Sequence, residues 1–275
     1  MKKKIIISSM MILVFFFIGL INAQNFTVVV IPDTQKYTLE DTDIFSKQTQ
    51  WIVDNKDSLN IQMVLHVGDM VEYYDDKSEW KLADESMSIL DGEVPYLISP
   101  GNHDFDDVDL KDIENIEKTI KNYENYFGYK RFEDYEWYKG HYPEDSNRNS
   151  YSLLNINGMK FGFLALRLAP TEDELDWANK IVSNNPDYRF IIVTHTFVHT
   201  NSQLNAVGNA IWEGFAQKWE NIFLVVCGHA GGEGFNTRVG INGNLIFETV
   251  FGILSNYQTD PPDEYGKLRY YEFVP

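Results

Sequence analysis

Apolar residues along the chain form two patterns, which alternate. Short continuous apolar runs are typical of buried strands, whereas apolar residues three or four positions apart are typical of helices with one buried side. The runs that predict strands are residues 26–31, 61–67, 94–98, 150–156, 159–166, 190–194, 222–227, 237–241, 244–250 and 268–274. This alternation of strands and helices indicates a chain of the α/β class.

Several stretches between these runs have helical spacing. The expected buried sides of the first two helices are Ile44, Phe45, Trp51 and Ile52, and then Trp80, Ala83, Met87 and Leu90. Residues 108–126 and 205–219 are also expected to contain helices. Thr171, with Glu174 three residues later, is a capping box that predicts the start of another helix. The buried side of that helix is expected to be Leu175, Ala178 and Val182.

Two Asn-Gly dipeptides predict hairpin turns. Asn157-Gly158 and Asn242-Gly243 each lie between two strand-like runs, where this dipeptide is the strongest short hairpin signal. We find no linker, internal repeat or low-complexity segment. Residues 24–275 are therefore expected to form one α/β domain of the α+β four-layer type, in which two packed mixed β-sheets are flanked by helices.

The first residues have the layout of a secretory signal peptide. Lysines at positions 2–4 precede an apolar run over 5–20, and the small residue Ala23 follows shortly afterwards. We expect residues 1–23 to be removed and the protein to be secreted or periplasmic. The alternative is an uncleaved membrane anchor, because the run is only slightly shorter than a spanning helix.

Charge and cysteine content exclude some classes of protein. Removal of the three lysines with the signal peptide would change the formal charge from −18 to −21. Such a surface repels nucleic acids and anionic membranes, so we expect no nucleic-acid partner and no stable membrane association after cleavage. The single cysteine, Cys227, lies in an apolar run and is interpreted as a buried, inert residue.

Polar motifs follow five of the predicted strands at the point where each ends. The most informative is Gly101-Asn102-His103-Asp104, which places an amide, an imidazole and a carboxylate on one turn. The other four are Asp33-Thr34-Gln35, Gly68-Asp69, His195 and Gly228-His229. The carboxyl ends of strands are where open α/β sheets form their binding sites. Five such ends with potential metal ligands are difficult to explain as core packing.

This ordered set of motifs resembles the calcineurin-like metallophosphoesterases over essentially the whole chain after residue 23. The resemblance implies a centre of two divalent metal ions bridged by the catalytic carboxylate of Asp69. Asn102, His195 and His229 would complete the second metal site, Asp33 would hold the first metal, and His103 matches the catalytic histidine of the family. Glu72 matches a position where relatives often carry a residue that orients this imidazole, although a solvated loop glutamate is an equal alternative.

Physical chemistry agrees with these roles. A hydroxide held between two dications is a strong nucleophile near neutral pH, and the ions neutralise charge on a phosphoryl group. Adjacent side chains diverge, so His103 cannot easily bind the same ion as Asn102 and is free to protonate the leaving-group oxygen.

The chain departs from the family pattern at the first metal. The usual Asp-x-His is Asp33-Thr34-Gln35, and the usual Gly-His-x-His is Gly228-His229-Ala230-Gly231. The remaining donors for the first site are Asp33, Asp69 and the Gln35 carbonyl, with waters or Glu233. An all-oxygen site favours Mn²⁺, Mg²⁺ or Ca²⁺ and is expected to be the weaker site, whereas the second favours Mn²⁺, Fe or Zn²⁺. The opening Pro-Asp-Thr-Gln resembles a subgroup of exported bacterial members.

Other residues are candidates for the surroundings of the site. His199 and Arg148 are candidate substrate contacts, and His141 and Arg167 are weaker ones. His66 is expected to be buried with its ring nitrogens satisfied. Three segments are also expected near the site: the surface excursion 129–149, the glycine-rich loop 231–234, and Tyr257-Gln258 at the rim.

Two functions of different classes are consistent with this sequence. The first is an exported metal-dependent phosphoesterase that hydrolyses a phosphomonoester or phosphodiester with a metal-bound hydroxide and His103 as general acid. Its substrate would be a phosphorylated small molecule, a glycan or a phosphodiester. The alternative is a catalytically impaired metal-binding or recognition protein on the same fold. A serine hydrolase is less consistent, because the chain has no Gly-x-Ser-x-Gly motif.

Overall fold

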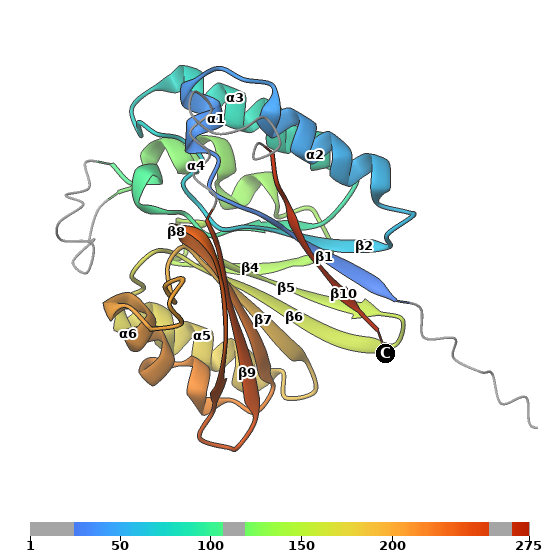
Figure 1. Ribbon diagram of the computed structural model, residues 1–275, viewed down its shortest axis with the longest axis vertical. Helices are drawn as coiled ribbons and strands as arrows, with labels where there is room; N and C mark the ends of the chain where they lie inside the picture. The colour runs from blue at the N-terminus through green and yellow to red at the C-terminus, as the bar shows by residue number, and fades with distance from the viewer. Residues whose placement is uncertain (1–24, 107–118, 253–265, 275) are drawn as a thin grey trace, which may run out of the picture.

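The computed structural model describes residues 25–106, 119–252 and 266–274, which form two mixed β-sheets packed face to face (Figure 1). The first sheet has the strand order β10-β1-β2-β3. Its strands are β1 (Phe26–Ile31), β2 (Ile61–His66), β3 (Tyr96–Ile98) and β10 (Arg269–Phe273). The first three strands are parallel, and β10 pairs with β1 in the antiparallel direction. All six residues of β1 are buried, as a continuous apolar run predicts for a central strand.

The second sheet has six strands in the order β4-β5-β6-β7-β8-β9. They are β4 (Tyr138–Tyr142), β5 (Asn149–Ile156), β6 (Met159–Leu166), β7 (Arg189–Thr194), β8 (Ile222–Val239) and β9 (Leu245–Gly252). β6, β7 and β8 are parallel to one another, and the other pairs are antiparallel. Both Asn-Gly dipeptides lie in the turns of hairpins, between β5 and β6 and between β8 and β9.

Helices cover the outer face of each sheet, so the fold has four layers (Figure 1). The first sheet carries α1 (Gln35–Leu39), α2 (Ile44–Asn55), α3 (Lys77–Met87) and α4 (Lys121–Phe127). The second sheet carries α5 (Glu172–Asn184) and α6 (Ala206–Gly214). Short 3₁₀ turns are formed by Ser88–Leu90, Asn102–Asp104, Tyr129–Arg131 and Ala216–Lys218. This architecture is the predicted fold class, and no described helix has the length and apolar character needed to span a membrane.

Burial explains why these segments form these elements. The space between the sheets is filled by apolar side chains from both, including Phe26, Val28, Phe163 and Ile191. The predicted buried side of α5 is confirmed, and Thr171 and Glu174 form the capping box at its start. Trp80, Ala83, Met87 and Leu90 are fully buried, which confirms the predicted side of α3 and the 3₁₀ turn after it.

The structure corrects several predicted elements. Trp51 is 38% exposed, so it does not belong to the buried side of α2. The predicted excursion 129–149 contains β4, an edge strand, and the predicted loop 231–234 is part of β8. The predicted helix 205–219 ends at Gly214 and is followed by a 3₁₀ turn. The signal peptide 1–23, residues 108–118 of a predicted helix and Tyr257-Gln258 lie outside the described residues.

Candidate metal centre

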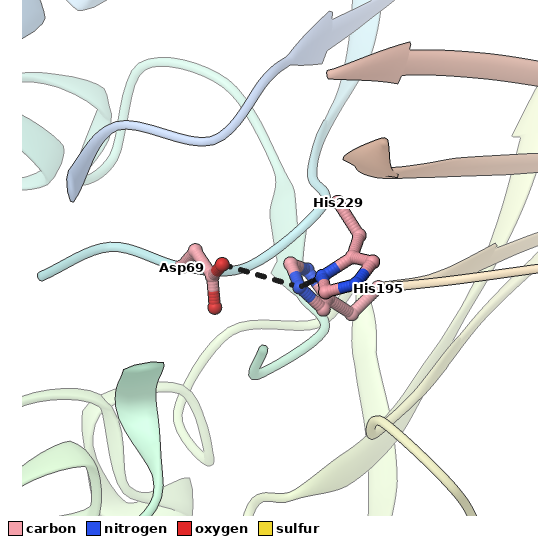
Figure 2. A group of neighbouring side chains, drawn as sticks. All are labelled: Asp69, His195 and His229. Carbon is pink, nitrogen blue, oxygen red and sulfur yellow. Dashed lines mark hydrogen bonds and ion pairs between the residues drawn. The ribbon is translucent and has the colours of Figure 1, made fainter. Parts of the chain in front are cut away.

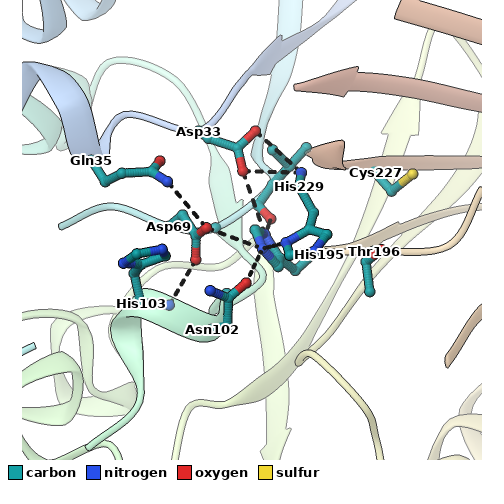
Figure 3. Close-up of polar contacts among 12 residues, drawn as sticks. Asp33, Gln35, Asp69, Asn102, His103, His195, Thr196, Cys227 and His229 are labelled. Carbon is teal, nitrogen blue, oxygen red and sulfur yellow. Dashed lines mark hydrogen bonds and ion pairs between the residues drawn. The ribbon is translucent and has the colours of Figure 1, made fainter. Parts of the chain in front are cut away.

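The polar side chains at the strand ends meet at one edge of the two sheets (Figure 3). Asp33, Asp69 and Asn102 follow β1, β2 and β3 of the first sheet, whereas His195 follows β7 of the second. His229 lies within β8, between Cys227 and Gly231, where the pairing of β8 with β9 is interrupted. The irregularity and a φ of 63° at His229 turn its side chain out of the regular ladder.

Four potential ligand atoms converge at the centre of this group. Nε2 of His195 lies 3.0 Å from Oδ1 of Asn102, 3.1 Å from Nδ1 of His229 and 3.3 Å from Oδ2 of Asp69. Figure 2 shows the rings of His195 and His229 directed toward one another and toward the Asp69 carboxylate. The ligand atoms of these three residues lie within 4.8 Å of one another, which is the spacing that one metal ion requires. The structure thus brings together all four residues predicted for the second metal.

The orientation of His195 is determined by its other ring nitrogen. Nδ1 lies 2.8 Å from the carbonyl oxygen of Val67 and donates a hydrogen bond to it. A histidine that binds a metal commonly donates its second N–H to a carbonyl in this way, which leaves the first nitrogen as the ligand. Nε2 is therefore the atom of His195 that faces the cluster.

The pKa shifts of the clustered side chains are consistent with a site for a cation. Burial opposes the charged form of His195, but the charge and hydrogen bond of Asp69 and the charge of Asp33 raise its pKa to about 9. Burial would raise the pKa of Asp69, yet the charge and hydrogen bond of His195 lower it to about 2. Burial and the charge on His195 lower the pKa of His229 to about 4. The buried Asp69 carboxylate thus favours a positive charge beside it, and a divalent ion bound by the neutral imidazoles would supply that charge.

The oxygen donors predicted for the first metal lie close to Asp69. The carboxylate of Asp33 accepts a hydrogen bond from the backbone N–H of His229, with Oδ1 3.0 Å away, and burial raises its pKa to about 7. Nε2 of Gln35 lies 3.3 Å from Oδ2 of Asp69. Its carbonyl oxygen, Oε1, is buried and has no hydrogen-bond partner among the described residues. A buried acceptor without a donor, on a side chain that contacts a carboxylate, fits a hard cation.

Glu233 does not join these donors. Its carboxylate is exposed and forms an ion pair with Arg269 of β10. The expectation that Glu233 completes the first site is therefore not supported by the structure. The described oxygen donors for the first metal site are therefore the side chains of Asp33, Gln35 and Asp69.

Two glycines are required by the close packing of the centre. A Cβ on Gly101 would lie 2.2 Å from Oδ1 of Asp69 and 2.6 Å from Nδ1 of His195. A Cβ on Gly228 would lie 2.7 Å from Oδ2 of Asp33. Larger residues would displace the ligands, which explains why glycine precedes Asn102 and His229.

The last residue of the Gly-Asn-His-Asp motif has a role that the sequence analysis missed. The carboxylate of Asp104 accepts hydrogen bonds from the backbone N–H groups of Met70 and Gly101, each at 2.8 Å. It therefore joins the turn that carries Asp69 to the turn that carries Asn102. Burial raises the pKa of Asp104 to about 7. The place of Asp104 within the Gly-Asn-His-Asp motif was the feature of the sequence that could have indicated this role.

His103 lies at the less buried side of the centre, where its side chain is 22% exposed. Its Nδ1 lies 2.7 Å from the backbone carbonyl oxygen of Glu72. The carboxylate of Glu72 is 4.0 Å from Nδ1 and forms an ion pair with Lys36 at 2.9 Å. The hydrogen bond to the imidazole is thus made by the main chain of Glu72, whereas the carboxylate lies at the outer distance of an ion pair with it.

The remaining candidates divide into nearby and distant residues. His66 is fully buried, with its ring nitrogens 3.2 Å from Oγ1 of Thr34 and 3.0 Å from the N–H of Gly68, as predicted. His199 is exposed, and its charge contributes to the lowered pKa of His229.

The side chains of Arg148 and His141 contact neighbouring residues outside the metal centre. Nε of Arg148 contacts Oγ of Ser146 at 3.1 Å, and Nε2 of His141 contacts the carbonyl of Glu144 at 2.9 Å. Arg167 is buried in an ion pair with Glu174. Cys227 is buried, which raises its pKa to about 12 and agrees with an inert residue.

Comparison with known proteins gives three findings. The family model of the calcineurin-like phosphoesterases matches residues 26–231. The uncharacterized protein YvnB of Bacillus subtilis (strain 168) is 31% identical over 261 residues, which are 90% of this chain and 19% of YvnB. The purple acid phosphatase PPD1 from yellow lupin (Lupinus luteus) seeds has a similar fold, with a TM-score of 0.56 and 14% identity over 84% of this chain and 44% of that chain.

This chain therefore spans about a fifth of YvnB and less than half of the lupin enzyme. The family match covers most of the described residues, including Asp33, Gln35, Asp69, Asn102, His195 and His229. The chain belongs to the calcineurin-like phosphoesterase family.

Proposed function

We propose that this protein is a metal-dependent hydrolase of phosphomonoesters or phosphodiesters. The observation that carries the proposal is the convergence of ligand atoms of Asp69, Asn102 and His229 on Nε2 of His195, at distances of 3.0 to 3.3 Å. Family membership implies a dinuclear metal centre, and the donor atoms of Asp69, His195 and His229 fit one of its two ions. One ion would be held by Asn102, His195 and His229, and the other by Asp33 and Gln35. Asp69 would bind both ions.

The residues of this chain have separate tasks in the proposed reaction. The bound ions would supply Lewis acidity that activates water and neutralises phosphoryl charge. The Glu72 carbonyl accepts a hydrogen bond from Nδ1–H of His103, so in the protonated ring Nε2–H is the donor that would protonate the leaving-group oxygen, and the ring would then be neutral with its proton on Nδ1. His199, exposed near His229, is proposed to contact the substrate, a phosphorylated small molecule, a glycan or a phosphodiester.

Metal-dependent turnover tests the proposal. The chelator-treated protein should hydrolyse p-nitrophenyl phosphate or bis-p-nitrophenyl phosphate only after Mn²⁺, Mg²⁺, Ca²⁺ or Zn²⁺ is restored. His103→Ala should lower kcat by about 100-fold, the lower end of the effect of a general acid, because p-nitrophenolate leaves easily. Metal content should be unchanged in this variant, and His141→Ala should behave as the parent protein. Absence of turnover with every ion would favour the recognition protein.

The oxygen-rich first site predicts unequal metal affinities. Gln35→His restores a nitrogen donor beside Asp33, and nitrogen donors favour zinc. We expect zinc retained after dialysis to increase from about one to about two ions per chain, measured by plasma mass spectrometry. Gln48→His is a matched control, because Gln48 is another buried glutamine, on α2 and outside the centre. An unchanged zinc content in Gln35→His would contradict the assignment of Gln35.

We further propose that the chain is exported with cleavage after Ala23 and that it belongs to the exported subgroup with the Pro-Asp-Thr-Gln opening. The support is the basic, apolar and small-residue pattern of residues 1–23. Intact-mass measurement of protein from the medium or periplasm tests this proposal. A protein of full mass in the membrane fraction would instead indicate the uncleaved anchor.

A further inference from the structure

We propose that Glu79 positions the imidazole of His103 through the peptide group that joins Glu72 to Tyr73. Glu79 lies on α3, outside every motif of the metal centre. This inference rests on the proposed function, because it gives His103 the role of general acid. Glu79 would be a positioning residue and would not touch the substrate.

The geometry links the two side chains through one peptide group. The carbonyl oxygen of Glu72 lies 2.7 Å from Nδ1 of His103. The N–H of the same peptide group, on Tyr73, lies 3.4 Å from Oε2 of Glu79. Oε2 of Glu79 also accepts a shorter hydrogen bond of 2.6 Å from the N–H of Glu72. The carboxylate and the imidazole therefore bind opposite ends of one amide.

The surroundings of Glu79 make it a fixed anchor. Its side chain is buried, with the residue 3% exposed, and Oε2 also accepts a hydrogen bond from Oγ1 of Thr38 at 3.3 Å. Thr38 in turn lies 3.1 Å from the carbonyl oxygen of Met70. Glu79 thus holds the turn that begins directly after Asp69 and ends at Tyr73.

The arrangement affects His103 in two ways. Hydrogen bonds to a carboxylate are stronger than those between neutral groups, and they polarise the amide that donates them. The polarised Glu72 carbonyl is a better acceptor for Nδ1–H, which keeps that proton on Nδ1 and directs Nε2 outward, where the imidazolium form carries the proton that is donated. The Glu72 carboxylate does not do this directly, because it lies 4.0 Å from Nδ1 and binds Lys36.

Nitrogen-15 NMR of the His103 ring is the first test, because it needs no turnover. Spectra would be recorded in alkaline solution, where the neutral ring has a defined tautomer, without metal and with zinc. We expect His103 to carry its proton on Nδ1 in the parent protein. Glu79→Ala should give a mixture of tautomers, and Glu79→Gln, which keeps an acceptor oxygen without the charge, should give a smaller change.

Glu124→Gln is the matched control. Glu124 also uses its carboxylate to accept a backbone N–H, that of Asn147, and a hydroxyl, that of Ser146, but on α4 and away from His103. The Glu124→Gln variant should leave the NMR signals of the His103 ring unchanged. Unchanged ring signals in both Glu79 variants, in folded protein, would overturn the proposal.

Kinetics provide the second test. Glu79→Ala should lower kcat by about 10-fold, a typical effect of a residue that orients a functional group, with KM and metal content unchanged. The loss should be larger for a phenyl or alkyl phosphate than for p-nitrophenyl phosphate, because a poor leaving group depends more on the general acid. Equal losses on all substrates would indicate a merely structural role. If the parent protein hydrolyses none of them, the proposed function fails, and the NMR comparison still decides whether Glu79 controls the ring.

Discussion

Asp69→Asn is expected to lower phosphoesterase turnover at least about a thousandfold and to reduce the bound metal. Asp69 is the only residue assigned to both ions, and its Oδ2 lies 3.3 Å from Nε2 of His195. Its Oδ1 also accepts the backbone N–H of His103 at 2.9 Å. Asparagine offers one neutral oxygen, so it cannot bridge two dications. Loss of about 4 kcal/mol of transition-state stabilisation corresponds to three factors of ten in rate.

The measurement combines kcat/KM with metal analysis on the same preparations. Asp187→Asn serves as the control, because it also removes one negative charge, but from a surface ion pair with Lys160. It should retain the parent values. If Asp69→Asn kept both metals and lost less than about tenfold in kcat/KM, equivalent to 1.4 kcal/mol, Asp69 would not be the bridging ligand.

Glu174→Ala is expected to lower the free energy of unfolding by about 3 to 5 kcal/mol, the usual cost of removing one partner of a buried ion pair. Oε2 of Glu174 lies 2.7 Å from Nε of Arg167, and the side chains are 4% and 2% exposed. The same carboxylate accepts the N–H of Thr171 at 2.7 Å and Nδ2 of Asn149 at 3.1 Å. One side chain therefore joins the end of β6, the start of β5 and the first turn of α5.

Urea unfolding followed by circular dichroism would measure this loss. Glu172→Ala is the matched control, since Glu172 lies in the same first helical turn but is exposed. Its effect should stay below about 1 kcal/mol, the range for a surface charge near a helix start. A loss of similar size in both variants would mean that the ion pair contributes little beyond the helix terminus.

Most of the fold could be predicted because its strands are short, apolar and bounded by local signals. The bounds predicted for β1 and β6 agree with the structure, and the capping box marked the start of α5. β4 could not be predicted in this way. Its residues show no alternation, and its pairing with β5 is irregular between Tyr138 and Gly140, so only the partner strand defines it.

The candidate site was predictable where a side chain carries the chemistry. The residues Asp33, Asp69, Asn102, His195 and His229 are brought together as their positions at strand ends suggested. Contacts made by the main chain were not predictable, because every residue has a carbonyl and an N–H. The Glu72 carbonyl on His103 and the N–H groups bound by Glu79 and Asp104 are of this kind. Their identity depends on the course of the chain in three dimensions.

The proposed metal donors come from both sheets, Asp33, Asp69 and Asn102 from the first and His195 and His229 from the second. Neither sheet alone carries a complete set, and the last donor lies about 200 positions after the first along the chain. We therefore expect a nascent chain to have no high-affinity site until its two halves have docked. If these residues bind the ions, we expect uptake of the ions to be a late event in maturation that completes folding instead of initiating it.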